Sequence, residues 1–264
     1  MNRSPSRLVW ILSLALSASR ALAQTPLDIE QLIDIKHPSN PIFSKDGRSV
    51  AFLWDRAGLA NLYVVGVGAG EKPRAVTSLK EGQPGGVFWS ADGASLFYSY
   101  GGDLWQAPIA PGAEIRPVWQ TPGNETGMTP SPDLTRVAYV RSGEGGFEIF
   151  VRSLSGGAES KVVGELAAAA GLSWSPDGTQ LAFIVARSIR HDETPAYSGT
   201  KIIYTITERT PAQAYVVKLA GGPAVPIGPP GGFGGLRWSD SNHLVFDRTS
   251  ADFKRRTIYQ ADSR

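Results

Sequence analysis

Hydrophobic and polar residues alternate along most of this 264-residue chain, in a pattern that returns five times. In each copy an alternating apolar run leads into a short turn, and a second alternating run follows it. Alternation with a period of two residues predicts strands with one buried face, and a turn between two such runs predicts a hairpin. The copies occupy residues 41–52, 87–98, 128–139, 172–183 and 236–246.

The turns of the first, second and fourth copies follow the pattern Ser-x-Asp-Gly, which is clearest as Ser-Pro-Asp-Gly at residues 175–178. In such a turn the aspartate bonds nearby backbone, the proline has its φ already set, and the glycine takes a positive φ. The third copy has Leu134 in place of the glycine, and the turn after Ser239 in the fifth copy has decayed. The aspartates and tryptophans of the copies are therefore expected to build sheets rather than a catalytic array of carboxylates.

The spacing of the copies predicts the architecture. The serines that begin the turns lie 46, 41, 44 and 64 residues apart, counted along Ser44, Ser90, Ser131, Ser175 and Ser239. A further strand is predicted in each unit, at 61–65, 103–107, 147–151, 213–217 and 257–261. A period of roughly 40–45 residues is typical of a four-stranded propeller blade. The expected fold class is all-β, a β-propeller of about five four-stranded blades over residues 37–264, with an insertion at about 188–211.

The two ends of the repeated region carry further expectations. Before it, a short leader helix is expected within 24–36, where Thr25 can cap the helix and Pro26 suits its first turn. After it, the fifth copy breaks off at Arg264, where a turn closing the blade is expected. Because propellers have roughly four to eight blades, this pattern favours an open or incomplete ring, without hydrogen bonds between the first and last blades.

Residues 1–23 have the composition of a secretory signal peptide. Arginines near the start precede a short apolar run at 8–16, and an Ala-Leu-Ala sequence ends at Ala23. The run is too short to span a bilayer of about 30 Å. We expect cleavage between Ala23 and Gln24, export to the periplasm or the extracellular space, and no stable membrane insertion afterwards.

Removal of this segment changes the charge of the chain. The whole sequence has 26 basic and 24 acidic side chains, and residues 1–23 contain three of the arginines and no acidic residue. The remaining 241 residues therefore carry 23 basic and 24 acidic side chains, a net charge of −1, so nucleic acid is not an expected partner. The chain has no cysteine, which excludes disulfides, thiolate metal sites and cysteine nucleophiles.

The sequence Trp-Ser-Pro-Asp-Gly at 174–178 resembles the WD-like repeats of two groups of propellers. One is the periplasmic TolB type, and the other is the N-terminal propeller of prolyl oligopeptidase-family serine peptidases, including the dipeptidyl peptidase IV and acylaminoacyl peptidase branches. Residues 25–32 followed by 40–47 resemble the leader helix and first blade of exported peptidases of this family. The resemblance covers nearly all of 25–264 and implies a propeller that gates substrate access to an α/β-hydrolase domain.

The chain lacks the residues that such a hydrolase domain needs. A G-x-S-x-G nucleophile elbow is absent, and the histidines at 37, 191 and 243 are each expected at a surface or turn. Where dipeptidyl peptidase IV-type propellers have an acidic pair, the matching stretch 164–170 has only Glu165. We therefore expect no catalytic residue, no cofactor and no metal site, and no activity from this chain alone.

The densest polar group lies in the insertion of the fourth unit and consists of Arg190, His191, Asp192, Glu193 and Tyr197. In a full peptidase this insertion would line the substrate cavity or contact the hydrolase domain. The alternative is a solvated loop or an extended hairpin edge. A metal site is not expected, because adjacent residues on such a segment rarely converge on one ion.

Two functional hypotheses remain open from the sequence. In the first, the chain is the propeller of a prolyl oligopeptidase-family peptidase, and its partners are a peptide substrate or a hydrolase domain. In the second, it is a self-contained TolB-like periplasmic propeller that binds envelope proteins. A propeller enzyme with chemistry in its central funnel has no supporting cluster of residues.

Overall fold

The computed structural model describes residues 38–55, 58–186, 188–193, 204–209, 211–249 and 254–263. Every described residue belongs to one compact unit, Lys36–Arg264. The predicted signal peptide and leader helix lie outside the described residues. Within them all regular elements are strands, as the alternation predicts, and no helix is long and apolar enough to cross a membrane.

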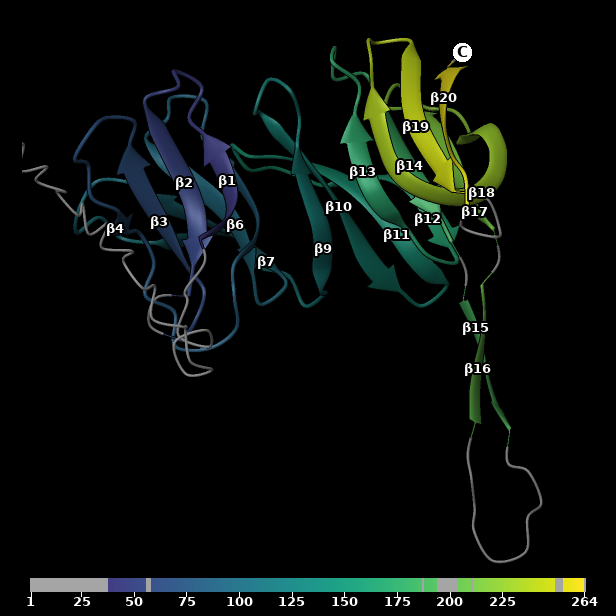
Figure 1. Ribbon diagram of the computed structural model, residues 1–264, viewed down its shortest axis with the longest axis horizontal. Coiled ribbons are helices and arrows are strands. Elements are labelled where there is room, and N and C mark those ends of the chain that lie inside the picture. Colours follow the sequence, from purple (N-terminus) through teal and green to yellow (C-terminus); the bar gives the residue numbers. More distant parts are fainter. Residues whose placement is uncertain are drawn as a thin grey trace, which may run out of the picture. The chain divides into compact units, whose positions relative to one another are not determined.

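Three four-stranded antiparallel sheets come first along the chain (Figure 1). Blade 1 contains β1 (Ser39–Phe43), β2 (Ser49–Trp54), β3 (Asn61–Gly66) and β4 (Arg74–Ala75). Blade 2 contains β5 (Gly85–Trp89), β6 (Ser95–Tyr100), β7 (Asp103–Pro108) and β8 (Arg116–Trp119). Blade 3 contains β9 (Glu125–Pro130), β10 (Arg136–Gly143), β11 (Gly146–Ser153) and β12 (Ser160–Leu166). These sheets confirm the predicted four-stranded blades.

The fourth and fifth units form one six-stranded sheet instead of two separate ones. Its strands, in order, are β13 (Ala170–Trp174), β14 (Gln180–Val185), β17 (Ala212–Lys218), β18 (Val225–Trp238), β19 (His243–Thr249) and β20 (Arg256–Asp262). The 14-residue β18 pairs with β17 up to Gly231 and with β19 from Gly232 onward. We call β13, β14, β17 and the first half of β18 blade 4, and the second half of β18 with β19 and β20 blade 5.

The insertion of the fourth unit forms a separate two-stranded ribbon. Strand β15 (Ser188–Glu193) pairs antiparallel with β16 (Tyr204–Arg209), from Ser188 opposite Arg209 to Glu193 opposite Tyr204. Strand β14, before the ribbon, pairs directly with β17, after it, so the ribbon does not interrupt the sheet of blade 4.

The first four turns, which begin Ser-x-Asp and continue with glycine or, in the third, with Leu134, form the predicted hairpin turns. In each, the serine hydroxyl donates to the aspartate two residues later, and the backbone N–H five residues later donates to that hydroxyl; the serines are Ser44, Ser90, Ser131 and Ser175. At Gly178 the backbone has a φ of +69°, which favours glycine. The hydrogen bond from Ser175 is the main cause that lowers the pKa of Asp177.

The core lies between consecutive blades. We call the face that a blade packs against the preceding blade its leading face, and the opposite one its trailing face. Four clusters fill the junctions, and the largest fully buried side chains among them are Tyr98, Tyr139, Phe183 and Phe246. Fully burying a side chain of the Leu or Phe class contributes about 1.5–3 kcal/mol. Packing between blades therefore holds this unit together.

Tryptophan indoles add a hydrogen bond at three of the four junctions. Each indole N–H donates to a backbone carbonyl on the first strand of the preceding blade. The bonds run from Trp89 to Ile42 over 3.2 Å, from Trp174 to Thr129 over 3.0 Å and from Trp238 to Ser173 over 3.1 Å. At the same position blade 3 has Pro130, which offers no donor. The tryptophans are thus structural, as the sequence predicts.

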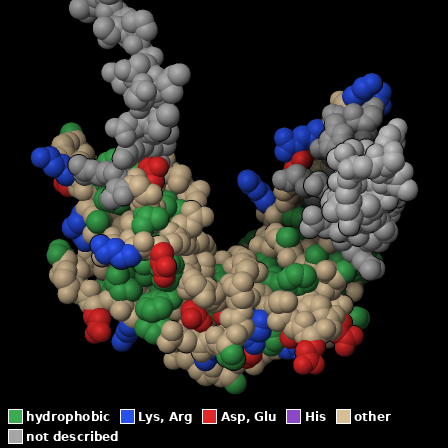
Figure 2. Space-filling model, turned by 90° about the horizontal axis from the view of Figure 1, so that it is seen from below, with side chains coloured by type: hydrophobic (Ala, Val, Ile, Leu, Met, Phe, Trp, Pro, Cys, Tyr) green, Lys and Arg blue, Asp and Glu red, His purple; other side chains and the backbone are tan. Residues whose placement is uncertain are grey.

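No strand pair joins blade 1 to blade 5 within the described part of the chain. This agrees with the expectation of an open ring. Figure 2 shows one side of the molecule, on which Lys and Arg side chains lie scattered among acidic and hydrophobic ones.

Candidate functional site

The trailing face of blade 5 differs from every other trailing face. In each of blades 1–4, four positions on the second and third strands meet the next blade, and none of these sixteen side chains is exposed. They are Ala51, Leu53, Leu62, Val64, Phe97, Ser99, Leu104, Gln106, Ala138, Val140, Ile149, Val151, Ala182, Ile184, Ala214 and Val216. The same positions in blade 5 are Val245, Asp247, Ile258 and Gln260. Ile258 is 74% exposed and Gln260 is exposed as well. Within the described part of the chain, two of these four positions are therefore open to solvent, whereas Val245 and Asp247 are half-buried.

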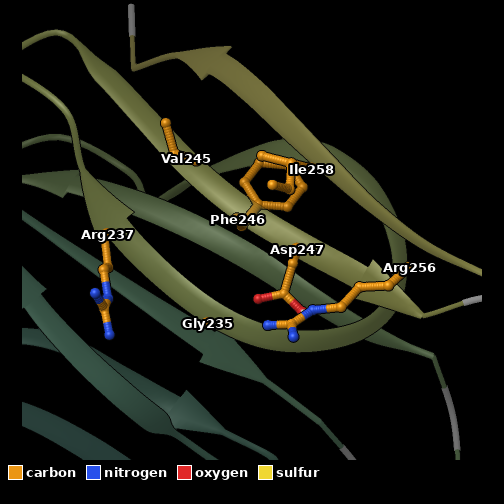
Figure 3. Close-up of a pocket in the computed structure, with 7 residues that line it drawn as sticks. All are labelled: Gly235, Arg237, Val245, Phe246, Asp247, Arg256 and Ile258. Carbon is orange, nitrogen blue, oxygen red and sulfur yellow. The ribbon is translucent and has the colours of Figure 1, made fainter.

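A hollow of about 540 Å³ lies on this face. Figure 3 shows its lining, which β18, β19 and β20 supply: Gly235, Arg237, Val245, Phe246, Asp247, Arg256 and Ile258. Strand alternation explains most of this arrangement, because Val245 and Asp247 of β19 and Arg256 and Ile258 of β20 lie on the trailing side. Phe246 is the exception, since it packs in the buried junction with blade 4. The hollow therefore combines an apolar floor with charged groups at its margins.

One ion pair crosses the hollow. Arg256 Nε lies 2.7 Å from a carboxylate oxygen of Asp247, and Figure 3 shows the two side chains pointing toward each other. The hydrogen bond from Arg256 lowers the pKa of Asp247, and the same bond raises the pKa of Arg256. Arg237 is exposed and has no ion-pair partner among the described residues. The site can offer a cation and an apolar contact to a ligand.

Sequence reasoning missed this face, although a signal for it exists. When the five copies are aligned through their strand registers, Asp247 stands where the others have Leu53, Ser99, Val140 and Ile184. A charge at a position that is otherwise used for blade packing distinguishes this face from the trailing faces of the other described blades.

A second polar cluster lies within blade 3. We call Glu125, Tyr139, Arg141 and Glu159 the Arg141 network. Arg141 donates from Nε to Glu125 over 2.8 Å and from both terminal nitrogens to Glu159 over 2.7 Å each. Glu125, whose side chain is 0% exposed, also accepts a hydrogen bond from Thr121. The guanidinium of Arg141 lies 4.6 Å from the centre of the Phe150 ring.

Electrostatics explain the state of this network. The hydrogen bonds from Arg141 are the main cause that lowers the pKa of Glu159 to about 2. Burial is the main cause that raises the pKa of Tyr139, and its hydroxyl donates to Glu159 over 2.5 Å. Arg141 thus stays charged and saturated with partners. A hollow of about 340 Å³ lies beside it, but the network is arranged to hold structure rather than to receive a ligand.

The residues predicted from the insertion are placed only in part. The backbone of Arg190, His191, Asp192 and Glu193 lies in β15, opposite β16. Their side chains and the whole of Tyr197 lie outside the described part of the chain. The role expected for them stays a prediction.

The fifth turn brings a serine, an aspartate and a histidine together without forming a catalytic triad. Nδ1 of His243 lies 2.9 Å from the carboxylate of Asp240. The hydroxyl of Ser239, however, donates to the backbone carbonyl of His243 and not to its ring. A nucleophile needs its proton acceptor within hydrogen-bond reach, so this group is a turn. Among the described residues, no cluster of three or more His, Asp or Glu side chains could hold a metal.

Comparison with known proteins supports the fold. No family model and no curated protein matches the chain. Among solved structures, TolB from Acinetobacter baumannii matches 86% of this chain and 55% of its own, at 16% identity and a TM-score of 0.56. A TolB-like protein from Agrobacterium tumefaciens matches 72% of this chain and 64% of its own, at 19% identity and a TM-score of 0.51. Dipeptidyl peptidase 4 from Porphyromonas gingivalis matches 89% of this chain and 40% of its own, at 14% identity and a TM-score of 0.59.

The chain thus spans between 40% and 64% of the lengths of these three proteins. At such identities the likeness concerns the fold and not the activity. The blades, their turns and these neighbours together identify the chain as a β-propeller similar to those of TolB and dipeptidyl peptidase 4.

Proposed function

We propose that this chain is an exported propeller module that works by binding another protein on the trailing face of blade 5. The observation that carries the proposal is the exposure of Ile258 and Gln260 at positions that the next blade covers in blades 1–4. An apolar patch with charged margins is typical of a surface that a protein partner covers. This is the TolB-like hypothesis of a binding module, with a surface assigned to it.

The chemistry of the face defines the partner. Val245 and Ile258 favour apolar side chains in the partner, and Arg237 favours a carboxylate beside them. The pair of Asp247 and Arg256 fixes the orientation, because each of its charges disfavours a like charge. A folded envelope protein with an acidic rim around an apolar patch meets these requirements.

Site-specific crosslinking in the native host tests this proposal. A photoreactive residue in place of Arg237, which lines the hollow, should give one discrete crosslinked species that contains a second polypeptide. Adding Val245→Glu should remove that species, because a carboxylate would enter the apolar floor. The matched control is the same photoreactive residue at Val67, an exposed apolar position on blade 1. Equal crosslinking at both positions, or none at Arg237, contradicts the proposal.

Export is part of the same proposal. The signal-like composition of residues 1–23 supports it. N-terminal sequencing of the protein recovered from the periplasm or the medium should begin at Gln24. Recovery of the intact chain from the cytoplasm alone would contradict export.

The second candidate is the propeller of a prolyl oligopeptidase-family serine peptidase, which gates substrate access to a hydrolase domain. The likeness to dipeptidyl peptidase 4, which covers 89% of this chain, favours it. This candidate predicts a G-x-S-x-G segment in the same genome, either downstream in the same reading frame or in an adjacent gene. A chromogenic dipeptide assay should give activity only when that hydrolase is present with this chain. Activity of the hydrolase that is indifferent to the chain would contradict a gating role.

A further inference from the structure

A further hollow lies between the turns of blades 1 and 2. We number each Ser-x-Asp turn with its blade, so that turn 1 is 44–49 and turn 2 is 90–95. The hollow has a volume of about 460 Å³, and small-molecule sites have roughly 300–1,000 Å³. Described residues bound it on both sides. They are Ser44, Lys45, Asp46, Arg48, Ser49, Ala91, Asp92, Gly93 and Ile109.

The lining of this hollow holds charges of both signs that are not paired with one another. Lys45, Asp46, Arg48 and Asp92 are all exposed, and none of them forms an ion pair within the described part of the chain. The hydrogen bond from the serine that begins each turn is the main cause that lowers the pKa of Asp46 and of Asp92, so both are charged at neutral pH. Two charges of each sign favour a ligand that itself carries both signs.

Both aspartates keep one oxygen available. In each, Oδ1 accepts the serine hydroxyl and a backbone N–H of the same turn. Oδ2 accepts no hydrogen bond from the described residues, since these bonds all end on Oδ1. The turns therefore hold the two carboxylates in place and leave an acceptor on each for a ligand.

Other turns of the repeat show how the equivalent space is filled by the chain itself. Between turns 3 and 4, Arg136 donates to the backbone carbonyl of Gly178 over 2.9 Å. Gln180, at the same position of turn 4, donates to a carbonyl of turn 5 over 3.0 Å. Turn 1 has the short Ser49 at this position. A Cβ on Gly178 would lie 3.1 Å from Arg136, whereas a Cβ on Gly93 would meet nothing within 4 Å. The space of a guanidinium is thus open at turn 2.

We propose that this hollow binds an arginine that carries a free carboxylate. The guanidinium donates to the carbonyl of Gly93, as the chain's own guanidinium does at turn 4, and to Oδ2 of Asp46 and Asp92. Its five N–H groups suffice for these acceptors. The carboxylate of the ligand accepts from Lys45 and Arg48, which adds charge-assisted hydrogen bonds of the stronger kind.

Two sources offer this chemistry, the C-terminal arginine of a peptide and the free amino acid. Free arginine has an ammonium group beside its carboxylate, which would stand next to Lys45 and Arg48. A peptide has a neutral amide at that place, so the charges of the hollow favour the peptide. The site shares no residue with the hollow on blade 5, and the inference does not rest on the proposed function.

NMR titration of the full chain with N-acetyl-arginine, which models a C-terminal arginine, is the first test. The backbone amides of turns 1 and 2 should shift and saturate, with a dissociation constant of about 1 mM or lower. N-acetyl-citrulline lacks the charge of the guanidinium, and N-acetyl-argininamide lacks the carboxylate. Each should bind about fivefold or more weakly than N-acetyl-arginine, and free arginine should also bind more weakly.

Variants of the two turns form the second test. Ser49→Arg should abolish binding, because the chain then supplies its own guanidinium, as it does between turns 3 and 4. Asp92→Asn keeps an oxygen for the bonds of the turn but removes the charge, and should weaken binding about fivefold. Asp133→Asn, the same change in turn 3, is the matched control and should leave binding unchanged. Circular dichroism and urea denaturation check that each variant is folded.

Three results would overturn the inference. They are the absence of a saturable shift, equal binding of N-acetyl-citrulline and N-acetyl-arginine, and unchanged binding in a folded Ser49→Arg variant. Tighter binding of free arginine than of N-acetyl-arginine would overturn the peptide as the source. Val245→Glu, which tests the partner face of blade 5, should leave the binding of N-acetyl-arginine unchanged, so the two proposals fail separately.

Discussion

Leu134 occupies a turn position that the chain otherwise gives to glycine. Its φ is +59°, close to the +69° of Gly47, Gly93 and Gly178 at the same position of their turns. A side chain in this left-handed region costs roughly 1–2 kcal/mol, because Cβ approaches the following carbonyl. Leu134 also lines a small groove with the exposed Phe43. The strain is therefore kept at a position that touches an apolar surface.

Leu134→Gly should raise the free energy of unfolding by about 0.5–1 kcal/mol, because the relief of strain exceeds the greater entropy of glycine in the unfolded chain. Urea denaturation measures the change. Gly178→Ala is the matched control and should lower stability, since a Cβ there would lie 3.1 Å from Arg136. A loss of stability in Leu134→Gly would show that the groove contact outweighs the strain.

Glu159 makes the stability of the protein depend on pH in the acid range. Its pKa is lowered from 4.5 to about 2 in the folded protein, chiefly by Arg141. The stabilisation is therefore complete above pH 4.5 and is lost as the pH falls through this range toward 2. Glu159→Gln should be less stable at neutral pH and should lose less stability as the pH falls from 4.5 to 2. Urea denaturation at several pH values tests this, with Glu144→Gln at an exposed position as control.

Arg141 compensates a carboxylate that has no access to water. Arg141→Met should lower stability by about 3–5 kcal/mol, because it leaves the buried Glu125 uncompensated. Adding Glu125→Gln to that variant should recover part of the loss, since the buried charge is then removed as well. Thermal and urea denaturation of the single and double variants measure the coupling. Strictly additive losses would argue against a shared network.

At the scale of elements, the indole hydrogen bonds connect one blade to the next. Trp174→Phe keeps most of the apolar contact but leaves the carbonyl of Thr129 without its donor. Stability should fall by about 1–2 kcal/mol. Trp105→Phe is an informative control, because Trp105 bonds Tyr100 within its own blade. Faster hydrogen exchange at the junction of blades 3 and 4 in Trp174→Phe alone would separate the two roles.

The hairpins of this fold can be predicted from the sequence, whereas the pairing of strands that lie far apart in the chain cannot. Hairpins depend on a period of two and on turn residues such as Asp177 and Gly178, all within about a dozen positions. The fourth strands are short or weakly patterned; β4 has only two residues. The merging of blades 4 and 5 through β18 is not visible either, because nothing local distinguishes a strand that changes partner from one that ends.

At the scale of the molecule, two kinds of surface follow from the repeat itself. Where one blade follows another, the trailing face is covered and its residues are small or apolar, with the exception of Gln106. Where no blade follows in the described chain, at blade 5, Asp247 and Ile258 replace that pattern. The candidate site was missed because no motif marks it: Asp247 and Ile258 stand out only when the strand registers of the five copies are aligned.

Strand β18 has a mechanical consequence. Blades 1, 2 and 3 are each joined to the next blade by a loop, whereas blade 4 continues into blade 5 within the single strand β18. A loop can act as a hinge, but a strand held by hydrogen bonds on both halves cannot bend without breaking them. Under a pulling force, blades 4 and 5 should therefore yield in one event, while the earlier blades release separately.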